Sequence, residues 1–455
     1  MRKRGRKGVA LLVVLWITAA LTLIMYAFLG EMQVEYSLSG SYGDEKKAEQ
    51  LAWSAVDLAC ITVDNAVQPW HGPNDLWATN PDRFYEIALG DGAFSVLHPT
   101  YADDGKLQWG LEDEASKVNL NYAPKEILMK LPRMTEEIAD SIIDWRDQDS
   151  NPGPSGAETG YYQGLSPAYA CKNAPFETVE ELLFVRGVTP EILYGRDLNL
   201  NGRIDPAEKD GGSTPDPGLY GLVTVWSSDK NQTLDGQAKI NVNGDLNAVT
   251  DAQLLQYGLT RGDLQVVLAC QLFYAGPVRS LAHLLTHQDA GRQFSGFPKE
   301  RFKLVVDKFA MMDGDAVPGL VNINTAPQQV LRCLPGITEE IGLKIIGART
   351  VSGADLSNMG WLTDVVAPGE LQQFANFITF HSYQYRIHAV GRIGIAYAMT
   401  TSAETDPQER PGAMRRMIAV YDRLATPRPR LVYWKDATKL GMPYDPSEGP
   451  EQSTK

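Results

Sequence analysis

The chain opens with Met1-Arg2-Lys3-Arg4-Gly5-Arg6-Lys7-Gly8, and this basic leader runs directly into the apolar stretch VALLVVLWITAALTLIMYAFL, residues 9–29. The apolar stretch carries no charge and is long enough to cross a bilayer as one helix. It is too long for the apolar core of an ordinary secretory signal, and no small-x-small cleavage site follows it. The stretch therefore predicts a membrane span over 9–30, with the leader (1–8) in the cytoplasm and the remainder exported.

The length, charge and cysteine content limit the number of domains and the classes of partner that the protein can have. The chain has 455 residues and a formal net charge of -14, so we expect two or three domains with ample core. An acidic exported part disfavours a nucleic-acid partner, which would require a basic face. The four cysteines have no metal-ligand spacing, and the sequence leaves their disulfide state open. They are Cys60, Cys171, Cys270 and Cys333.

A duplicated unit organises the middle of the chain. Residues Val118–Arg146 and Val321–Arg349 share 15 identities over 29 aligned positions, and both begin with Asn-x-Asn-x-Ala-Pro. Looser copies lie at Phe176–Tyr194 and Ile240–Cys270. Each close copy predicts two helices joined by a Leu-Pro-x-x bend, a helix-hairpin-helix with a Thr cap followed by paired Glu. The acids disfavour contact with phosphate, so we interpret the unit as a packing element.

Strand patterns flank this middle region. Strand patterns predict short strands at Ala93–His98 and Leu107–Leu111, and a hairpin formed by His381–Tyr397 and Arg415–Arg423. We therefore expect an α+β fold with a long N-terminal transmembrane helix and a small antiparallel sheet, interrupted by a large helical insertion domain with helix-hairpin-helix repeats. The expected divisions are 31–116 for the helix continuation and the first half of the sheet, 117–378 for the insertion, 379–425 for the closing strands and 426–455 for a flexible tail.

One loop fits an EF-hand calcium site at every ligand position. Side-chain or backbone oxygens are offered by six residues at the required spacing, Gly202 permits the sharp turn, and Pro206 disfavours a regular exiting helix. Hard oxygen ligands select Ca²⁺ over zinc or copper. The sequence predicts a structural calcium site with ligands Asp197, Asn199, Asn201, Arg203 (through its carbonyl), Asp205 and Glu208.

A second acidic cluster leaves two alternatives open. Asp147, Asp149 and Glu158 flank a Pro-Gly turn and offer oxygens for another calcium ion. A solvated loop anchored by Trp145 and the tyrosines at 161–162 explains the same residues.

Signatures of catalysis are missing from the sequence. His283 and His287 lie one helical turn apart but lack the Glu of a zinc protease. No Gly-x-Ser-x-Gly elbow, phosphate loop or dinucleotide fingerprint occurs. We therefore expect no enzymatic activity and no catalytic residue.

The leader, the repeated Asn-x-Asn-x-Ala-Pro units, the Asp-rich turn and the closing strands resemble those of the type II secretion minor pseudopilins called general secretion pathway protein K. That resemblance implies cleavage by a prepilin peptidase after Gly8 and N-methylation of Val9. Most pilin-like subunits carry Glu as the fifth mature residue, which pairs with the amine of the subunit above. Here that position is Val13, which suits a subunit at the tip of the fibre.

The resemblance also implies a function, partners and a location. The chain is expected to sit in the inner membrane with its bulk in the periplasm, to assemble with other minor pseudopilins at the tip of the pseudopilus, and to support protein export. Its further partners would be the prepilin peptidase, the inner-membrane secretion platform and the lipid bilayer around 9–29. The alternatives are a minor pilin of a type IV pilus or DNA-uptake system, and a membrane-anchored periplasmic protein that binds calcium or acts as a hydrolase.

Overall fold

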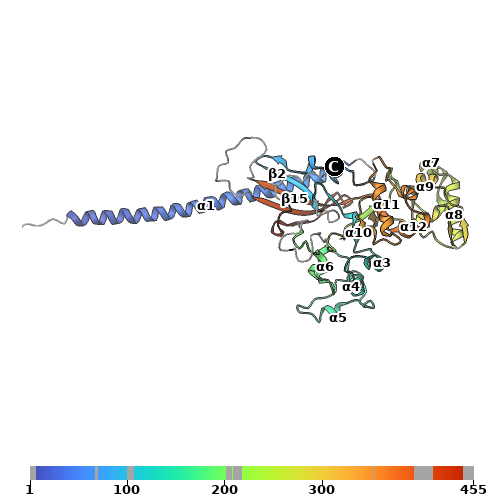
Figure 1. Ribbon diagram of the computed structural model, residues 1–455, viewed down its shortest axis with the longest axis horizontal. Helices are drawn as coiled ribbons and strands as arrows, with labels where there is room; N and C mark the ends of the chain where they lie inside the picture. The colour runs from blue at the N-terminus through green and yellow to red at the C-terminus, as the bar shows by residue number, and fades with distance from the viewer. Residues whose placement is uncertain are drawn as a thin grey trace, which may run out of the picture.

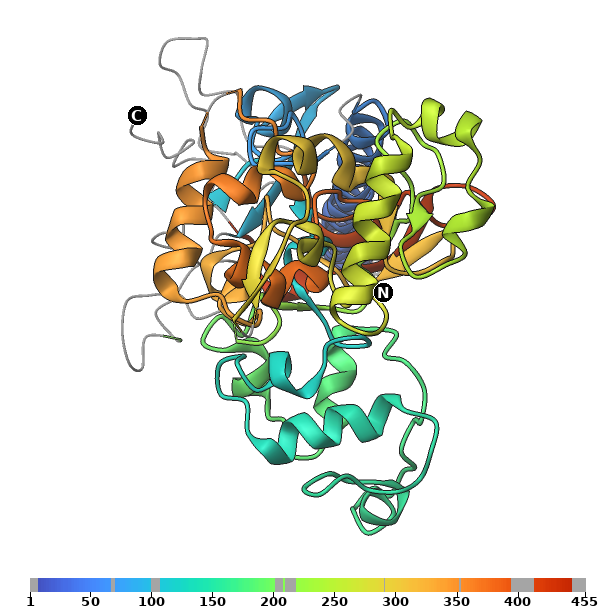
Figure 2. The ribbon, with the colours of Figure 1, turned by 90° about the vertical axis from the view of Figure 1, so that its right-hand side faces the viewer.

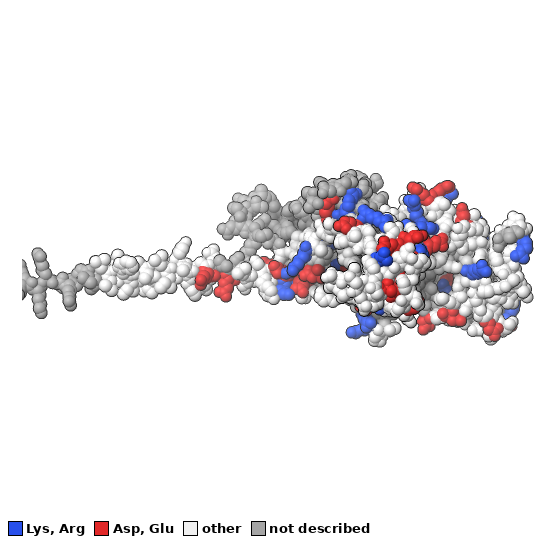
Figure 3. Space-filling view, turned by 90° about the horizontal axis from the view of Figure 1, so that it is seen from below, with Lys and Arg blue, Asp and Glu red and all other residues white. Residues whose placement is uncertain are grey.

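The computed structural model describes residues 7–66, 70–99, 107–200, 208, 218–289, 291–351, 353–393 and 413–443. Helix α1 (Lys7–Asp64) projects from a globular head as a long stem (Figure 1). Its first part exposes large apolar side chains such as Leu11, Trp16 and Leu29, and in Figure 3 this part is an uncharged surface that ends at a group of acidic side chains. By length and composition, α1 is the one helix of the described chain that could span a membrane.

The second half of α1 packs on a sheet. Small residues on one face of the helix are fully buried, namely Ala48, Ala52, Ala55 and Ala59. They recur every three or four residues, so they form one stripe along the helix. Opposite them lies Gly391 in strand β15 (Gln384–Ile393), and a Cβ placed there would lie 2.1 Å from the carbonyl oxygen of Ala48. The helix can approach this closely only because both surfaces lack bulk.

We expect Gly391→Ala to destabilise the head by about 1–3 kcal/mol, because the added methyl group meets helix backbone that cannot rotate away. Urea unfolding of the full chain in detergent, followed by tryptophan fluorescence, measures this free energy. Gly347→Ala is the matched control, since a Cβ at that helical position has no neighbour within 4 Å. It should be stabilising by about 0.5–1 kcal/mol, and equal effects of the two changes would contradict the close-packing explanation.

The sheet beneath α1 has the strand order β1-β2-β15-β16-β17 (Figure 1). The remaining strands are β1 (Ile87–Leu89), β2 (Gly92–Pro99), β16 (Met414–Asp422) and β17 (Arg430–Asp436), with the short β3 (Leu107–Gln108) and β4 (Glu112–Asp113) alongside. Strand β15 pairs antiparallel with both β16 and β2. The predicted hairpin of β15 and β16 is confirmed, and the pairing of β15 with β2 joins strands that lie far apart in the sequence.

The prediction of a flexible tail is wrong for Arg430–Asp436, which forms the edge strand β17. The strand is held from both faces. Trp434 meets Trp53 of α1 edge-to-face at 5.7 Å between ring centroids, and Lys435 lies 2.6 Å from the carboxylate of Glu180 in the head. Because these contacts come from distant segments, they could not be predicted from the Pro-rich, charged sequence of the tail.

The head between β4 and β15 is not purely helical. Three short parallel strand pairs close three successive units, and each pair begins at an Asn-x-Asn motif. The pairs are β5 (Val118–Asn119) with β6 (Val223–Thr224), β8 (Ile240–Asn241) with β11 (Phe309–Ala310), and β13 (Val321–Asn322) with β14 (Ile378–Thr379). Figure 2 shows the first unit as a lobe set apart from the other two.

The repeated Asn residues have a structural role. In each unit the first Asn side chain accepts a hydrogen bond from the backbone N–H of the second, at 2.9–3.0 Å. The second Asn side chain then donates to a carbonyl on a later loop, namely that of Phe176, Val278 or Leu356. An Asx turn thus shapes the loop locally, and the amide ties it to a remote segment.

The bends between paired helices share one backbone geometry. Arg133, Gly187, Gly258 and Gly336 all have positive φ, and each lies two residues before a Thr whose side chain accepts from a backbone N–H in the following helix. The helix pairs are α3 (Lys125–Leu128) and α4 (Glu136–Arg146), the 3-10 helix η2 (Val179–Phe184) and α6 (Pro190–Tyr194), α7 (Asp251–Gln256) and α8 (Arg261–Phe273), and α10 (Gln328–Leu331) and α11 (Glu339–Arg349). The other α-helices are α2 (Pro81–Phe84), α5 (Thr159–Tyr162), α9 (Lys299–Val305) and α12 (Pro368–Phe374).

Candidate metal centre

The acidic loop after α4 brings three carboxylates together. Asp147 lies at the C-terminal cap of α4, and Glu158 lies at the N-terminal cap of α5. One oxygen from each of Asp147, Asp149 and Glu158 lies within 4.8 Å of the other two. The spacing suits three oxygens around a shared cation, and all three residues are those that the sequence assigns to the second site.

Two of these carboxylates have oxygens that the protein leaves unsatisfied. Oδ1 of Asp147 and Oε1 of Glu158 are buried and have no hydrogen-bond partner among the described residues. Glu158 is only 6% exposed, so solvent does not compensate for the missing partner. A third such oxygen is Oδ1 of Asn173, whose amide nitrogen donates to the carbonyl of Asp149. Buried acceptors without donors are costly unless a cation meets them.

The electrostatics of the loop also favour a bound cation. Burial raises the pKa of Asp147, and the charge of Asp149 raises it further. The pKa of Asp144, one turn earlier in α4, is raised by burial and then by the charges of Glu158 and Asp147. A bound divalent cation would relieve this mutual repulsion. The donors are all carboxylate or amide oxygens, a set that suits Ca²⁺ and would hold it as a structural ion.

Only part of the predicted EF-hand loop can be compared with the structure. Asp197 is fully buried, and the carboxylate of Glu208 accepts a hydrogen bond of 3.1 Å from the backbone N–H of Leu198, which closes the loop. The predicted ligands Asn201, Arg203 and Asp205 lie outside the described residues. Calcium binding there stays a prediction.

The predicted loop is attached to the sheet through Arg416 of β16. The guanidinium of Arg416 is fully buried, and it donates to the carbonyls of Asn199 and Leu200 as well as to that of Gly441. The first half of the loop is thereby held in place from the sheet. Nothing in the local sequence around Arg416 indicates this role, because its partners in the loop, Asn199 and Leu200, lie more than 200 positions away.

The first lobe also matches a known family. Residues 125–195, which include the acidic cluster, match the family model described as type II secretion system protein K. Type II secretion system protein K of Aeromonas hydrophila is 30% identical over 219 residues, and that of Pseudomonas aeruginosa is 27% identical over 209 residues. The chain is thus similar to type II secretion system protein K, by the family model over residues 125–195 and by these partial alignments.

The matches cover part of each protein. The alignments span 42% and 40% of this chain, and 62% and 58% of the Aeromonas and Pseudomonas proteins. A protein K of Klebsiella pneumoniae is 26% identical, over 61% of its length. Among solved structures, a chain of the GspK-GspI-GspJ complex from enterotoxigenic Escherichia coli aligns with 89% of this chain and 99% of its own length, at 14% identity and a TM-score of 0.36.

If the acidic cluster binds calcium, the bound ion raises the free energy of unfolding. Glu158→Gln should abolish this calcium-dependent increase. At a free concentration one hundred times the dissociation constant, that stabilisation is about 2.7 kcal/mol. The measurement is the free energy of unfolding in excess calcium and in chelator. It is made in a chain that also carries Asp197→Ala and Glu208→Ala, so that the predicted EF-hand loop does not contribute.

Glu177→Gln is the matched control, because the Glu177 side chain is 83% exposed and pairs only loosely with Lys172 at 3.5 Å. It should leave the calcium response unchanged. A response that survives Glu158→Gln would place the ion elsewhere. The complementary chain, with Glu158→Gln and an intact loop 197–208, tests whether Asp197 and Glu208 bind calcium on their own.

The structure corrects the interpretation of the histidine pair. His283 belongs to a 3-10 helix, η5 (Leu281–Leu284), whereas His287 begins strand β9 (His287–Asp289), so the two do not share a helix face. Both ring nitrogens of His287 are engaged, with the hydroxyl of Tyr274 at 2.6 Å and the carbonyl of Leu285 at 2.7 Å. The four cysteines are all free thiols.

The sequence interpretation missed a buried ion cluster between the sheet and the head. Arg386 of β15 lies 2.5 Å from the carboxylate of Glu114, and Lys117 lies 2.9 Å from that of Glu112. Glu114, Lys117 and Arg386 are each at most 2% exposed. Single acids and bases at these positions look like surface residues in the sequence, so no local signal could have revealed the cluster.

Proposed function

We propose that this chain is a minor pseudopilin of a type II secretion system, assembling at the tip of the pseudopilus to support protein export across the outer membrane. Helix α1 is the observation that carries the proposal. Its first part is apolar, uncharged and exposed, as a helix needs to be in a bilayer, and its second part is built into the head. The match of residues 125–195 to the protein K family model supports the same assignment.

The tip position rests on Val13. An acid at this depth would need a cation from a neighbouring subunit, and α1 has no acid between Leu11 and Leu29. A subunit without the acid has no carboxylate to pair with the N-terminal amine of a subunit above it, so it suits the first position of a fibre. We further propose that other minor pseudopilins pack beside α1, with the prepilin peptidase and the inner-membrane platform as transient partners.

We also assign roles to the units of the head. We propose that the four bends between paired helices belong to helix-hairpin-helix elements used for packing. We also propose that the acidic loop is a structural calcium site. Glu136, Glu339 and Glu340 are exposed at two of the bends. Exposed acids there disfavour a nucleic-acid partner, and with it a DNA-uptake role.

The test is to determine the mature N-terminus of the chain after co-expression with a prepilin peptidase. We expect mass spectrometry to find a chain that begins at N-methylated Val9. Gly8→Val should block cleavage, because a branched side chain replaces the glycine that such peptidases accept, whereas Gly5→Ala in the same leader should leave it unchanged. An intact wild-type leader would contradict the assignment to pilin-like subunits.

The tip role needs a second measurement. Pull-down of the processed chain from membranes that contain the other pseudopilins should recover minor pseudopilins in a fixed ratio. Recovery of the major fibre subunit alone would contradict a position at the tip.

A further inference from the structure

A cavity of about 340 Å³ lies between the second and third units of the head. Its walls are mostly apolar, with side chains such as Phe309, Met311 and Met359. It is bordered by strand β7 (Ser228–Lys230), which pairs with β12 (Ala316–Pro318), and by β11 and β14. The volume falls in the range of small ligand sites, which are commonly apolar with a few polar groups in fixed positions.

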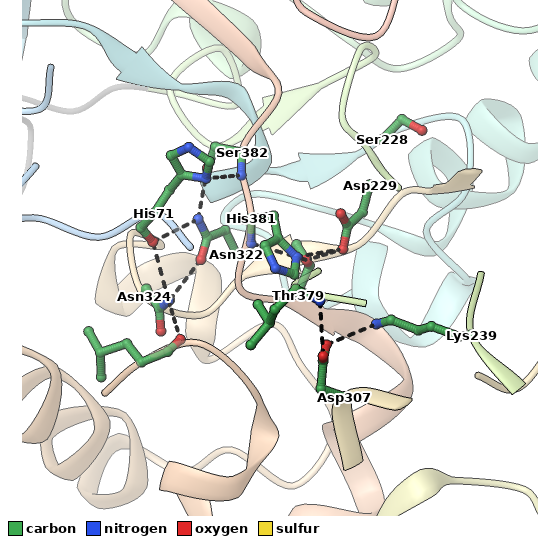
Figure 4. Close-up of polar contacts among 12 residues, drawn as sticks. His71, Ser228, Asp229, Lys239, Asp307, Asn322, Asn324, Thr379, His381 and Ser382 are labelled. Carbon is green, nitrogen blue, oxygen red and sulfur yellow. Dashed lines mark hydrogen bonds and ion pairs between the residues drawn. The ribbon is translucent and has the colours of Figure 1, made fainter. Parts of the chain in front are cut away.

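Three polar side chains converge in the cavity lining (Figure 4). The hydroxyl of Thr379 donates to Oδ2 of Asp229, and Nδ1 of His381 lies 3.2 Å from the same oxygen. Oδ1 of Asp229 is buried and has no hydrogen-bond partner among the described residues. Asp229 is 7% exposed, so the second oxygen is withdrawn from water without a donor. Both donors thus serve one oxygen and leave the other unsatisfied.

The two lysines near the cavity are engaged elsewhere. Lys239, which also lines the cavity, is directed to Asp307 at 3.9 Å, and Figure 4 shows it turned toward that carboxylate. The ammonium group of Lys230 lies over the ring of Tyr383, 5.2 Å from its centroid. Burial raises the pKa of Asp229, but the charge of His381 and the hydrogen bonds at Oδ2 outweigh it and leave the pKa below its ordinary value. Asp229 is therefore an anion at neutral pH.

The mouth of the cavity can adapt to different ligands. Met312 is 52% exposed at its rim, and its carbonyl is held by the amide of Asn231 at 2.8 Å. The backbone of Met312 is thus anchored by a hydrogen bond, while about half of the residue is exposed. Unbranched, polarizable methionines line sites that accept ligands of varied shape.

We propose that this cavity binds an organic cation, with an apolar body among Phe309 and the methionines and a protonated amine that donates to Oδ1 of Asp229. The ligand chemistry is an apolar stem ending in an ammonium group. A free amine carries it, and so does a lysine side chain presented by a protein. This inference is independent of the proposed role in the pseudopilus.

The test uses the full chain in detergent with ¹³C-methyl-labelled methionine. Phenethylamine should shift the methyl signals of Met311, Met312 and Met359 and saturate. Its carboxylate counterpart 3-phenylpropionate, of similar shape but opposite charge, should bind at least tenfold more weakly. Met25 and Met32 lie on the exposed stem and report partition of either compound into the micelle. Equal saturable binding of the two compounds would overturn the proposal, and so would shifts confined to the stem methionines both for phenethylamine and for the peptide described below.

Asp229→Asn should weaken the binding of phenethylamine about tenfold or more, since it removes one charge-assisted hydrogen bond. Asp235→Asn is the matched control, because the Asp235 side chain is 73% exposed and lies outside the cavity lining. The comparison of amine and carboxylate on the unmodified chain still decides the question if Asp229→Asn fails to fold.

A second arm distinguishes the sources of the ligand. An acetylated and amidated Leu-Lys-Phe peptide carries its cation only on the lysine side chain. Binding of the peptide with no binding of phenethylamine indicates a protein ligand, and the converse indicates a free amine. Failure of both to bind would overturn the proposal.

Discussion

Arg386→Met should destabilise the folded chain by about 3–5 kcal/mol, because it leaves the buried carboxylate of Glu114 without its main partner. Glu114 is fully buried, and Arg386 contacts it at 2.5 Å, whereas Lys117 lies 3.5 Å away and also serves Glu112. Arg386 further packs its guanidinium over the ring of Tyr220 at 4.8 Å. Urea unfolding of the full chain in detergent measures the loss.

The pH dependence identifies the cause. Burial alone would raise the pKa of Glu114, but the charges of Arg386 and Lys117 outweigh it and leave the pKa lowered. A lowered pKa contributes stability that is present at neutral pH and is lost as the pH falls through the folded-state value. In Arg386→Met the pKa of Glu114 should rise above its unfolded value. The deficit of the variant should therefore shrink as the pH falls toward 4.

Arg261→Met is the matched control, since Arg261 pairs with Asp251 at 2.6 Å but the two side chains are 52% and 82% exposed. It should cost at most about 1 kcal/mol. Adding Glu114→Gln to Arg386→Met should recover part of the loss, because the buried charge is gone. A pH-independent deficit that the second change does not reduce would show that lost packing, not an unpaired charge, is responsible.

Trp145→Ala should cost about 3–5 kcal/mol, because it empties the centre of the first lobe. Trp145 is 5% exposed and contacts Tyr162 edge-to-face at 5.4 Å and Phe184 in a stacked arrangement at 6.5 Å between ring centroids. It lies on α4 two residues before Asp147. We therefore expect the same change to loosen the acidic loop and to weaken the calcium binding proposed for it. Unfolding in chelator and in calcium separates the two effects.

Two variants check this prediction. Trp434→Ala removes the same side chain from an edge strand where it is 58% exposed, and it should cost clearly less. Trp145→Phe should also cost less than Trp145→Ala, because it keeps an aromatic ring and removes an indole N–H that is buried without a hydrogen-bond partner among the described residues. Equal costs for the alanine changes at 145 and 434 would contradict a core role for Trp145.

The periodic and repeated parts of the chain could be predicted because each is encoded by neighbouring residues. The apolar stretch 9–29 lies within α1, and the hairpin of β15 and β16 appears where alternation predicted it. The Asn-x-Asn motifs signalled a repeat, and their Asx turns are local hydrogen bonds. The acidic cluster was visible for the same reason, since its three residues span one short loop.

The features that escaped prediction depend on partners far away in the sequence. Strand β17 was taken for a loose tail because the tail is rich in proline and charge, whereas pairing with β16 and contacts with Trp53 and Glu180 hold it. The insertion was expected to be helical, because two-residue parallel strands are too short to produce a pattern. A strand such as β6 exists because the fold returns it to β5.

By itself, the sequence determined the apolar first part of α1, the repeated units of the head and the carboxylates of the acidic loop, because apolar runs, duplication and short-range spacing are properties of adjacent residues. Only the tertiary structure decided that Glu114 and Arg386, 272 positions apart, form a buried pair, and that Asp229 meets His381 beside an apolar cavity. Burial and pairing of a charge depend on which distant surface covers it. That cover exists only when the chain is folded.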